Sequence, residues 1–183
     1  YNNTISNNDL LCDGVGVRVT SSAWSSSDAY GNTVTGNTIE DAMFAGIRVD
    51  GASYNNTFAG NTITGTQLLT LDAGEDTEIT QGDGIFVESD AGTGNVFEDN
   101  SISGSEGDGM ENQITTSVDA SPNWWGDADP SDDIVGDVDY APWYLDAEMT
   151  TLAQQDCAGT WGGNAADLGC GCDLPGPSGC DNA

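Results

Sequence analysis

The sequence predicts an all-β chain that folds as a right-handed parallel β-helix, a solenoid whose coils each contain three short strands. Two observations support this prediction: a motif repeat with a period of 24 residues, and short runs of β-branched residues separated by Gly, Asn and Asp. The 3.6-residue periodicity that a helical solenoid requires is absent from the sequence.

Two tripeptides with the same spacing define the repeat. Asn-Thr-Val at 32–34 returns as Asn-Thr-Phe at 56–58, and Asn-Thr-Ile at 37–39 returns unchanged at 61–63, so both recur after 24 residues. Two independent motifs with one period indicate a repeated structural unit rather than a chance match.

Two insertions lengthen individual repeats. The next tripeptides begin at Asn95 and Asn100, later than one period would place them, and the surplus lies within the segment 66–82. Asn-Thr-Ile at 3–5 precedes its copy at 37–39 by more than one period, and part of this second surplus lies in 21–30. We expect both insertions to form recognition or contact surfaces.

A third motif, of the form Gly-Ile-Arg-Val, gives each repeat its third strand. Successive side chains of a strand point to opposite faces, so one apolar residue of each motif should enter the interior and stack on its copy in the next coil. The predicted columns are Ile5, Ile39, Ile63 and Ile102; Val34, Phe58 and Phe97; and Val17, Ile47, Ile85 and Met110.

The asparagines that begin the tripeptides should form ladders at the corners of the coils. A side-chain amide can bond its copy one coil away, and asparagine tolerates left-handed backbone angles. The predicted rungs are Asn32, Asn56 and Asn95, and Asn37, Asn61 and Asn100. Asn2 and Asn55 lie in Asn-X-Thr sequons, which permit glycosylation but also arise directly from the Asn-Thr repeat.

The charge balance limits the partners and the chemistry. The chain has two Arg, no Lys and no His against 31 Asp and Glu, so its net charge is −29. This charge disfavours binding to nucleic acids and acidic lipids. Such self-repulsion destabilises a compact state unless ions screen it, so we expect a saline or calcium-containing extracellular medium. No run of about 18 apolar residues indicates membrane insertion.

Four of the five cysteines cluster near the C-terminus. Cys157, Cys170, Cys172 and Cys180 predict two disulfides in an oxidising compartment, with three connectivities open, and a four-thiolate zinc site is the competing interpretation. Cys12 lies far away in an apolar run and is expected to be a buried free thiol.

The coil motifs, the segment Asn-Trp-Trp-Gly at 123–126 and the segment Val-Asp-Tyr-Ala-Pro-Trp at 138–143 carry a family resemblance. Together they resemble secreted bacterial and archaeal β-helix proteins of the NosD-like, carbohydrate-binding-and-sugar-hydrolysis group. The resemblance covers residues 1 to about 145 and implies a fold and an extracellular setting rather than a reaction.

The expected domains are a β-helix at 1–145, with its cap at about 118–145, and a tail at 146–183. The tail resembles the short Cys-Gly-rich repeats found after the main domains of large secreted bacterial proteins. An end coil must be covered, because its strand edges would otherwise recruit other chains. The side chains expected to form the cap, or alternatively to stack on sugars, are Trp124, Trp125, Trp143 and Tyr144.

Two acidic sets are candidate calcium sites. Asp83 and Asp108 precede the glycine of the third motif in consecutive repeats, with Glu106 nearby, whereas Ala45 holds the equivalent position one repeat earlier; Asp13 precedes that glycine in the first repeat. The second set, Asp127, Asp129, Asp132 and Asp133, lies between the tryptophan motifs with Asp137 and Asp139. Stacked like charges repel unless a cation bridges them, but a solvated halophilic surface explains the same pattern.

The sequence favours a protein that is not an enzyme. Lyases with a β-helix fold resemble one another in using a basic residue beside calcium to remove a proton from the substrate. The only candidates here are Arg18 and Arg48, and both are expected to point outward and to pair with acids such as Asp50. With 31 carboxylates, a pair at a glycosidase separation would arise by chance.

The predicted function is therefore an extracellular structural or adhesive module of a cell-surface or fibre-forming protein, with no catalytic residues assigned. Because the sequence begins in the middle of a coil, we expect head-to-tail stacking on a second copy, contact with other surface proteins, or further coils upstream. The alternative is a carbohydrate-binding or polysaccharide-processing module of the lyase or hydrolase type. Calcium is the one cofactor considered, and polysaccharide is the partner that the alternative implies.

Overall fold

The computed structural model describes residues 1–11, 14–21, 28–72, 78–167 and 172. Short strands repeat in the order that the sequence motifs predict, and three of them make one coil. The first coil contains β1 (Thr4–Ser6), β2 (Asp9–Leu11) and β3 (Val17–Thr20). The second contains β4 (Thr33–Thr35), β5 (Thr38–Glu40) and β6 (Phe44–Asp50).

The third coil contains β7 (Thr57–Ala59), β8 (Thr62–Thr64), β9 (Leu69–Asp72) and β10 (Glu78–Val87). The fourth contains β11 (Val96–Glu98), β12 (Ser101–Ser103) and β13 (Met110–Asn112). After them come β14 (Val118–Asp119), a 3-10 helix η1 (Pro130–Asp132), β15 (Ile134–Val135) and β16 (Val138–Asp139).

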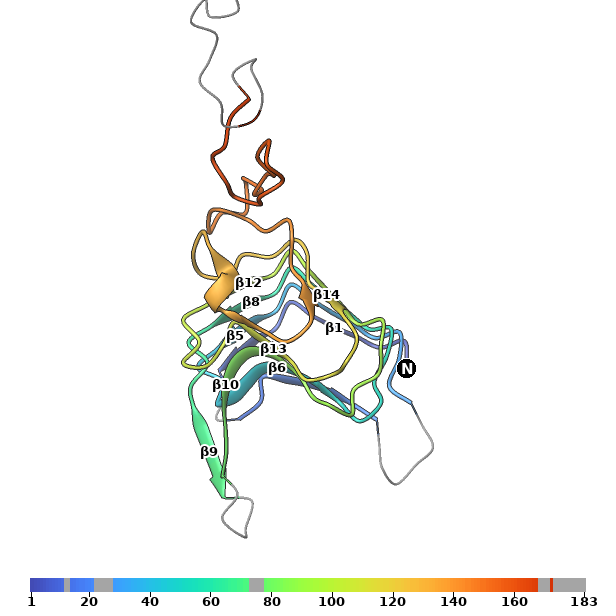
Figure 1. Ribbon diagram of the computed structural model, residues 1–183. Coiled ribbons are helices and arrows are strands. Elements are labelled where there is room, and N and C mark those ends of the chain that lie inside the picture. The colour runs from blue at the N-terminus through green and yellow to red at the C-terminus, as the bar shows by residue number, and fades with distance from the viewer. Residues whose placement is uncertain (12–13, 22–27, 73–77, 168–171, 173–183) are drawn as a thin grey trace, which may run out of the picture.

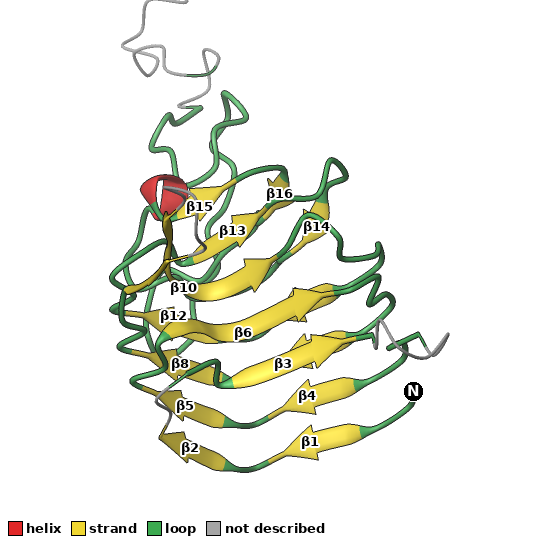
Figure 2. Cartoon of the chain, turned by 90° about the horizontal axis from the view of Figure 1, so that it is seen from below, coloured by secondary structure: helices red, strands yellow, loops and turns green. Residues whose placement is uncertain are grey.

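The coils stack so that equivalent strands pair in three parallel sheets (Figure 2). Their strand orders are β1-β4-β7-β11-β14-β16, β2-β5-β8-β12 and β3-β6-β10-β13-β15. Within the described part of the chain, β9 with β10 is the only antiparallel pair of named strands. The predicted parallel β-helix is confirmed.

The registers confirm the predicted interior columns except for Ile5. Ile39 pairs with Ile63 and Ile63 with Ile102, while Val34 pairs with Phe58 and Phe58 with Phe97. These side chains are at most 1% exposed, and the rings of Phe58 and Phe97 stack with their centroids 4.6 Å apart. The third column follows the paired residues Val17, Ile47, Ile85 and Met110.

The prediction for Ile5 was wrong. Ile5 pairs with Val34, and Leu10 pairs with Ile39, so the Asn-Thr-Ile tripeptide at 3–5 is a copy of the Val34 motif. The tripeptide at 3–5 is identical to the one at 37–39 but occupies the Val34 position, because Val and Ile both fill an interior position. The register depends instead on backbone pairing along the whole coil.

Both predicted asparagine ladders are present and extend beyond the predicted rungs. The Nδ2 group of each rung donates to Oδ1 of the next rung at 2.9–3.1 Å. Oδ1 of the next rung also accepts the backbone N–H of the previous one. One ladder runs through Asn3, Asn32, Asn56 and Asn95, and the other through Asn8, Asn37, Asn61, Asn100 and Asn123.

The left-handed backbone angles lie one residue before the rungs, not at the rungs as predicted. In the first ladder these positions alternate between Asn2, Gly31, Asn55 and Gly94, all with φ between 53° and 75°. The side chain of Asn2 covers Gly31 and that of Asn55 covers Gly94, so a Cβ on either glycine would collide with the asparagine that covers it. The alternation of Asn and Gly thus has a steric cause.

The insertion after β8 forms a hairpin rather than an irregular loop. β9 pairs with the first residues of β10, and β10 then continues into the third sheet between β6 and β13 (Figure 1). Phe44, Ala45 and Phe86 are buried outside the main core at this place, with Leu69 against them. The other insertion, at 21–30, falls largely outside the described residues.

The segments after β14 close one end of the solenoid. Trp125 and Trp143 are 2% and 6% exposed and belong to the main core, together with Ala153 from the following segment. Trp124 forms a parallel bridge with Ser101, and the hydroxyl of Tyr144 donates to Asp99 at 2.7 Å. Among the described residues, no helix is long and apolar enough to cross a membrane.

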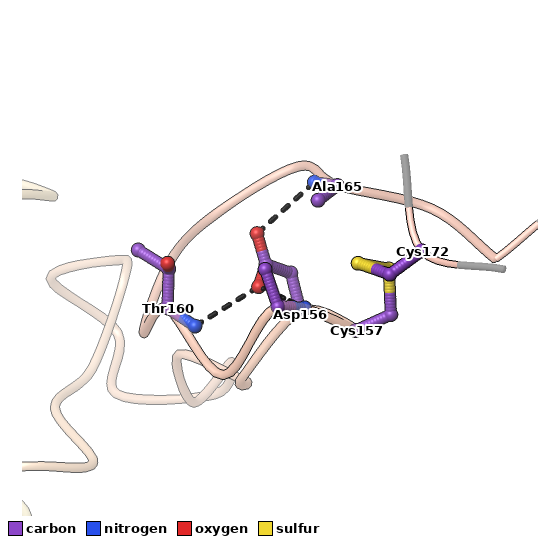
Figure 3. The surroundings of a disulfide bond; sticks show 6 residues. Asp156, Cys157, Thr160, Ala165 and Cys172 are labelled. Atoms are coloured by element: carbon purple, nitrogen blue, oxygen red, sulfur yellow. Dashed lines mark hydrogen bonds between the residues drawn. A yellow bond between two sulfur atoms is a disulfide. The ribbon is translucent and has the colours of Figure 1, made fainter. Parts of the chain in front are cut away.

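A disulfide fastens the chain beyond the solenoid. It joins Cys157 to Cys172, one of the pairings that the sequence left open (Figure 3). Next to it, the carboxylate of Asp156 accepts the backbone N–H groups of Ala158, Thr160 and Ala165. Cys12, Cys170 and Cys180 lie outside the described residues.

Candidate functional site

An acidic column on the third sheet is the strongest candidate site. Asp83 and Asp108 each stand two residues before an interior residue, and those two residues, Ile85 and Met110, are paired in adjacent coils. Asp83 is itself opposite Ala45 in the coil before, as the sequence alignment predicted. The parallel register therefore brings two carboxylates of consecutive coils to the same corner.

Asp83 is buried although its carboxyl group has an incomplete set of hydrogen bonds. The residue is 2% exposed, and Oδ1 accepts the backbone N–H of Asp108 at 2.9 Å. Oδ2 is also buried, and no group in the described part of the chain forms a hydrogen bond with it. A buried acceptor without a partner costs about 1–3 kcal/mol, and more if it is charged.

Burial raises the pKa of Asp83 to about 7, although the N–H of Asp108 acts in the opposite direction. The negative charges of Glu111 and Asp108 raise the pKa further. A direct hydrogen bond between Asp83 and Glu111 would require one of the two to carry a proton, since two carboxylates are both acceptors.

Glu111 is the third member of the group, and sequence reasoning missed it. One oxygen from each of Asp83, Asp108 and Glu111 lies within 4.8 Å of the other two. The Glu111 carboxylate accepts hydrogen bonds from Gln81 and Gln113, each at 2.9 Å, which fixes its position. Burial raises the pKa of Asp108, and the charge of Glu111 adds to this effect.

Glu106, which was predicted in this place, has another partner. Its Oε2 accepts the backbone N–H of Leu68 at 2.9 Å and so attaches the start of the hairpin to the fourth coil. The signal that would have identified Glu111 is its position in β13, one residue after Met110 and three after Asp108. Asp13 lies outside the described residues, and its predicted position in this column was wrong, because the register of β3 with β6 places Val15 at the position equivalent to Ala45.

The second acidic set gathers in part. Oxygens of Asp127, Asp132 and Asp133 lie within 4.8 Å of one another, with Asp127 and Asp132 exposed to solvent. Asp129 caps the 3-10 helix instead, where it accepts the N–H of Ser131. Burial raises the pKa of Asp133, and the charges of Asp127, Asp132 and Asp108 follow as smaller causes.

The positive side chains are occupied elsewhere. Arg18 and Arg48 are the only two in the chain, and both form ion pairs with Oδ2 of Asp50, at 2.6 and 2.9 Å. Arg48 also pairs with Glu88 at 2.5 Å and lies over the ring of Phe44. The predicted pairing of both arginines with Asp50 is confirmed.

The sequons and the tryptophans differ in exposure. Asn2 and Asn55 are exposed, with their side chains over glycines of the next coil. Trp125 and Trp143 are buried, and the indole N–H of Trp143 donates to the carbonyl of Ala128 at 2.9 Å. Trp161, in the segment next to the disulfide, is 36% exposed.

The stacked parallel coils and their asparagine ladders define the class of this protein, a β-solenoid of the parallel β-helix type. The family model for the right handed beta helix region matches residues 1–123, and the chain belongs to this family. No curated protein and no solved structure shows significant similarity to the chain.

Proposed function

We propose that this chain is a non-enzymatic structural or adhesive module of an extracellular surface or fibre-forming protein. The observation that carries the proposal is the continuous corner ladder from Asn8 to Asn123, which spans all coils and is buried along most of its length. Five amides joined in series, beside a continuous apolar core, favour a stiff rod over a mobile catalytic scaffold.

The chemistry of the described side chains supports this role over a polysaccharide lyase. An arginine that removes a proton from substrate must be free to reach it, but both arginines hold ion pairs with Asp50. Trp125 and Trp143, buried in the core, support the end of the solenoid and offer no ring face to a sugar.

Two features support the proposed extracellular setting. The disulfide between Cys157 and Cys172 is of a kind that persists in oxidising compartments. The net charge of −29 favours a medium in which ions screen the surface.

The proposed partners are a second copy of this chain or other surface proteins. The hairpin of β9 and β10 leaves the stack of coils (Figure 1), and Leu68 at its base is an apolar side chain that is 47% exposed. A protruding hairpin beside an exposed apolar residue is a contact surface that the solenoid itself does not use.

Electron microscopy of the purified protein, together with a glycan array, tests this function. We expect fibres or end-to-end assemblies, or binding to isolated cell surfaces, with no glycan signal and no release of sugar from acidic or neutral polysaccharides. Leu68→Asp should reduce assembly or surface binding, and Leu152→Asp is the matched control because Leu152 is 40% exposed outside the hairpin. Dispersed monomers that bind one defined polysaccharide would instead establish the carbohydrate-binding alternative.

A further inference from the structure

We propose that Asp83, Asp108 and Glu111 bind one divalent cation, with Ca²⁺ as the ion that best fits, and that the ion joins the third coil to the fourth. Asp83 belongs to β10 of the third coil, and the other two residues belong to the segment leading into and through β13 of the fourth. This proposal goes beyond the structural role, because binding of the cation does not depend on which partner the module contacts.

The buried carboxylate of Asp83 provides the first argument. Its Oδ2 atom is buried and, as far as the described residues go, has no hydrogen-bond donor, while its Oδ1 atom is already held by the N–H of Asp108. The two other carboxylates of the site lie within 4.8 Å. The unpartnered oxygen therefore belongs to a site that already holds two further anionic ligands.

The second argument is that the chain has no cation to offer this site. Its only two positive side chains, Arg18 and Arg48, are bound to Asp50 and Glu88. No Lys or His exists in the sequence. The repulsion among three close carboxylates is thus relieved only by protons or by an ion from solution.

The donor set indicates which ion. Carboxylate oxygens are hard ligands, and Ca²⁺ accepts six to eight of them at about 2.3–2.6 Å, so oxygens on opposite sides of the ion lie about 4.6–5.2 Å apart. One oxygen from each of the three carboxylates lies within 4.8 Å of the other two, which is inside the largest separation that two ligands of one Ca²⁺ can have. Three carboxylates supply up to six oxygens, and the amides of Gln81 and Gln113 hold Glu111 in place for the ion.

The competing account is a proton shared by Asp83 and Glu111. It would also relieve the repulsion, but it leaves Asp108 without compensation and requires no ion. The two accounts differ in one measurable respect, since the shared proton predicts no specific binding of Ca²⁺.

Isothermal titration calorimetry of the chelator-treated full chain with CaCl₂ provides the test, with thermal unfolding recorded on the same samples. Tb³⁺ luminescence is an independent readout, because the ring of Trp125 lies against Gly109, the residue after Asp108, and can sensitise an ion bound there. The variants are Asp83→Asn and Glu111→Gln. Asp139→Asn is the matched control, since Asp139 is an exposed carboxylate paired in register with Asp119 on another sheet.

The parent and Asp139→Asn should bind one equivalent of Ca²⁺ in a saturable manner and melt at a higher temperature when it is bound. Asp83→Asn and Glu111→Gln should fold, because each removes a negative charge from a crowded site, and should bind at least tenfold more weakly. The absence of saturable binding in the parent, or equal binding by Asp83→Asn, would overturn the site. Neither result depends on whether the protein assembles, so failure of this proposal and failure of the structural role remain distinguishable.

Discussion

Buried amides hold the corners of the coils, and one rung shows how. Asn61 is 1% exposed, donates from Nδ2 to Oδ1 of Asn100 and to the carbonyl of Val34, and accepts through Oδ1 from Asn37. Asparagine alone combines two donors and an acceptor on a side chain short enough for the corner. An aspartate would lose the donors, and a glutamine would not fit the coil spacing of about 4.8 Å.

Asn61→Ala should therefore lower the free energy of unfolding by about 3 kcal/mol or more, because several buried groups lose their partners together. Urea unfolding followed by circular dichroism measures the change. Asn164→Ala serves as the control, since Asn164 is exposed and should change the stability by less than about 0.5 kcal/mol. Equal effects in the two variants would mean that the ladder contributes little to stability.

Asp83 should make stability depend on pH when chelator is present. Its pKa is about 7 in the folded chain against an ordinary value of 3.8, so the folded state binds this proton more tightly than the unfolded state. Protonation of Asp83 therefore stabilises the folded state fully below pH about 4, and this stabilisation is lost as the pH rises through about 7. Asp108 and Asp133, whose pKa values are also raised, act in the same direction.

The free energy of unfolding in chelator should thus decrease between pH 5 and pH 8, and Asp83→Asn should decrease less. Urea titrations at the two pH values measure both slopes. Parallel slopes for the parent and the variant would show that Asp83 does not carry the effect.

At the scale of the strand, close packing of successive coils restricts the third motif. A Cβ on Gly46 would lie 2.7 Å from the carbonyl oxygen of Gly84, the equivalent glycine one coil further on. It would also collide with the side chain of Ile63 in the interior. The glycine of this motif is therefore required by the spacing between coils and not by a turn.

Gly46→Ala should lower the free energy of unfolding by about 1–3 kcal/mol, the usual cost of overpacking an interior. Gly14→Ala is the control, because Gly14 lies two residues before Gly16, the first-coil equivalent of Gly46, and a Cβ on Gly14 would meet no atom of the described residues within 4 Å. Thermal and urea unfolding of both variants give the comparison. A neutral Gly46→Ala would show that the sheet expands at no cost.

At the scale of the whole molecule, a one-dimensional stack must tolerate a high density of like charge. Each coil contacts mainly its neighbours, so repulsion between adjacent coils acts directly against the interfaces that hold the solenoid together. With a net charge of −29, screening should stabilise this chain more than it stabilises a neutral domain.

The melting temperature should accordingly rise by several degrees as NaCl increases from about 0.01 M to about 0.2 M, over which the Debye length falls from about 30 Å to less than about 10 Å. Scans with NaCl and NaSCN at equal ionic strength separate screening from specific anion effects, because screening alone gives equal shifts. A melting temperature that does not change with salt would mean that the charges are neutralised in another way.

The sequence by itself determined the local rules of this protein. The 24-residue period, the interior columns from the second coil onward and the asparagine ladders follow from the repeat, because each coil must meet its neighbour in the same way. Strand alternation predicted that both arginines point outward, and Asp50, which was named as one acidic partner, pairs with both. These features depend on spacing along one short unit, which a sequence records directly.

Only the tertiary structure decided the matters of register and side-chain reach. Ile5 lies in the Val34 column, because the backbone pairing of whole coils outweighs the identity of one tripeptide. Asn123 is a rung of the second ladder, although it begins a tryptophan motif. Glu111 joined Asp83 and Asp108 while Glu106 turned to Leu68, because the direction of each side chain depends on its place in β13 or in the preceding turn. The 24-residue period fixes which coils are neighbours, whereas the distance between two carboxylates depends on the backbone angles of the loops that carry them.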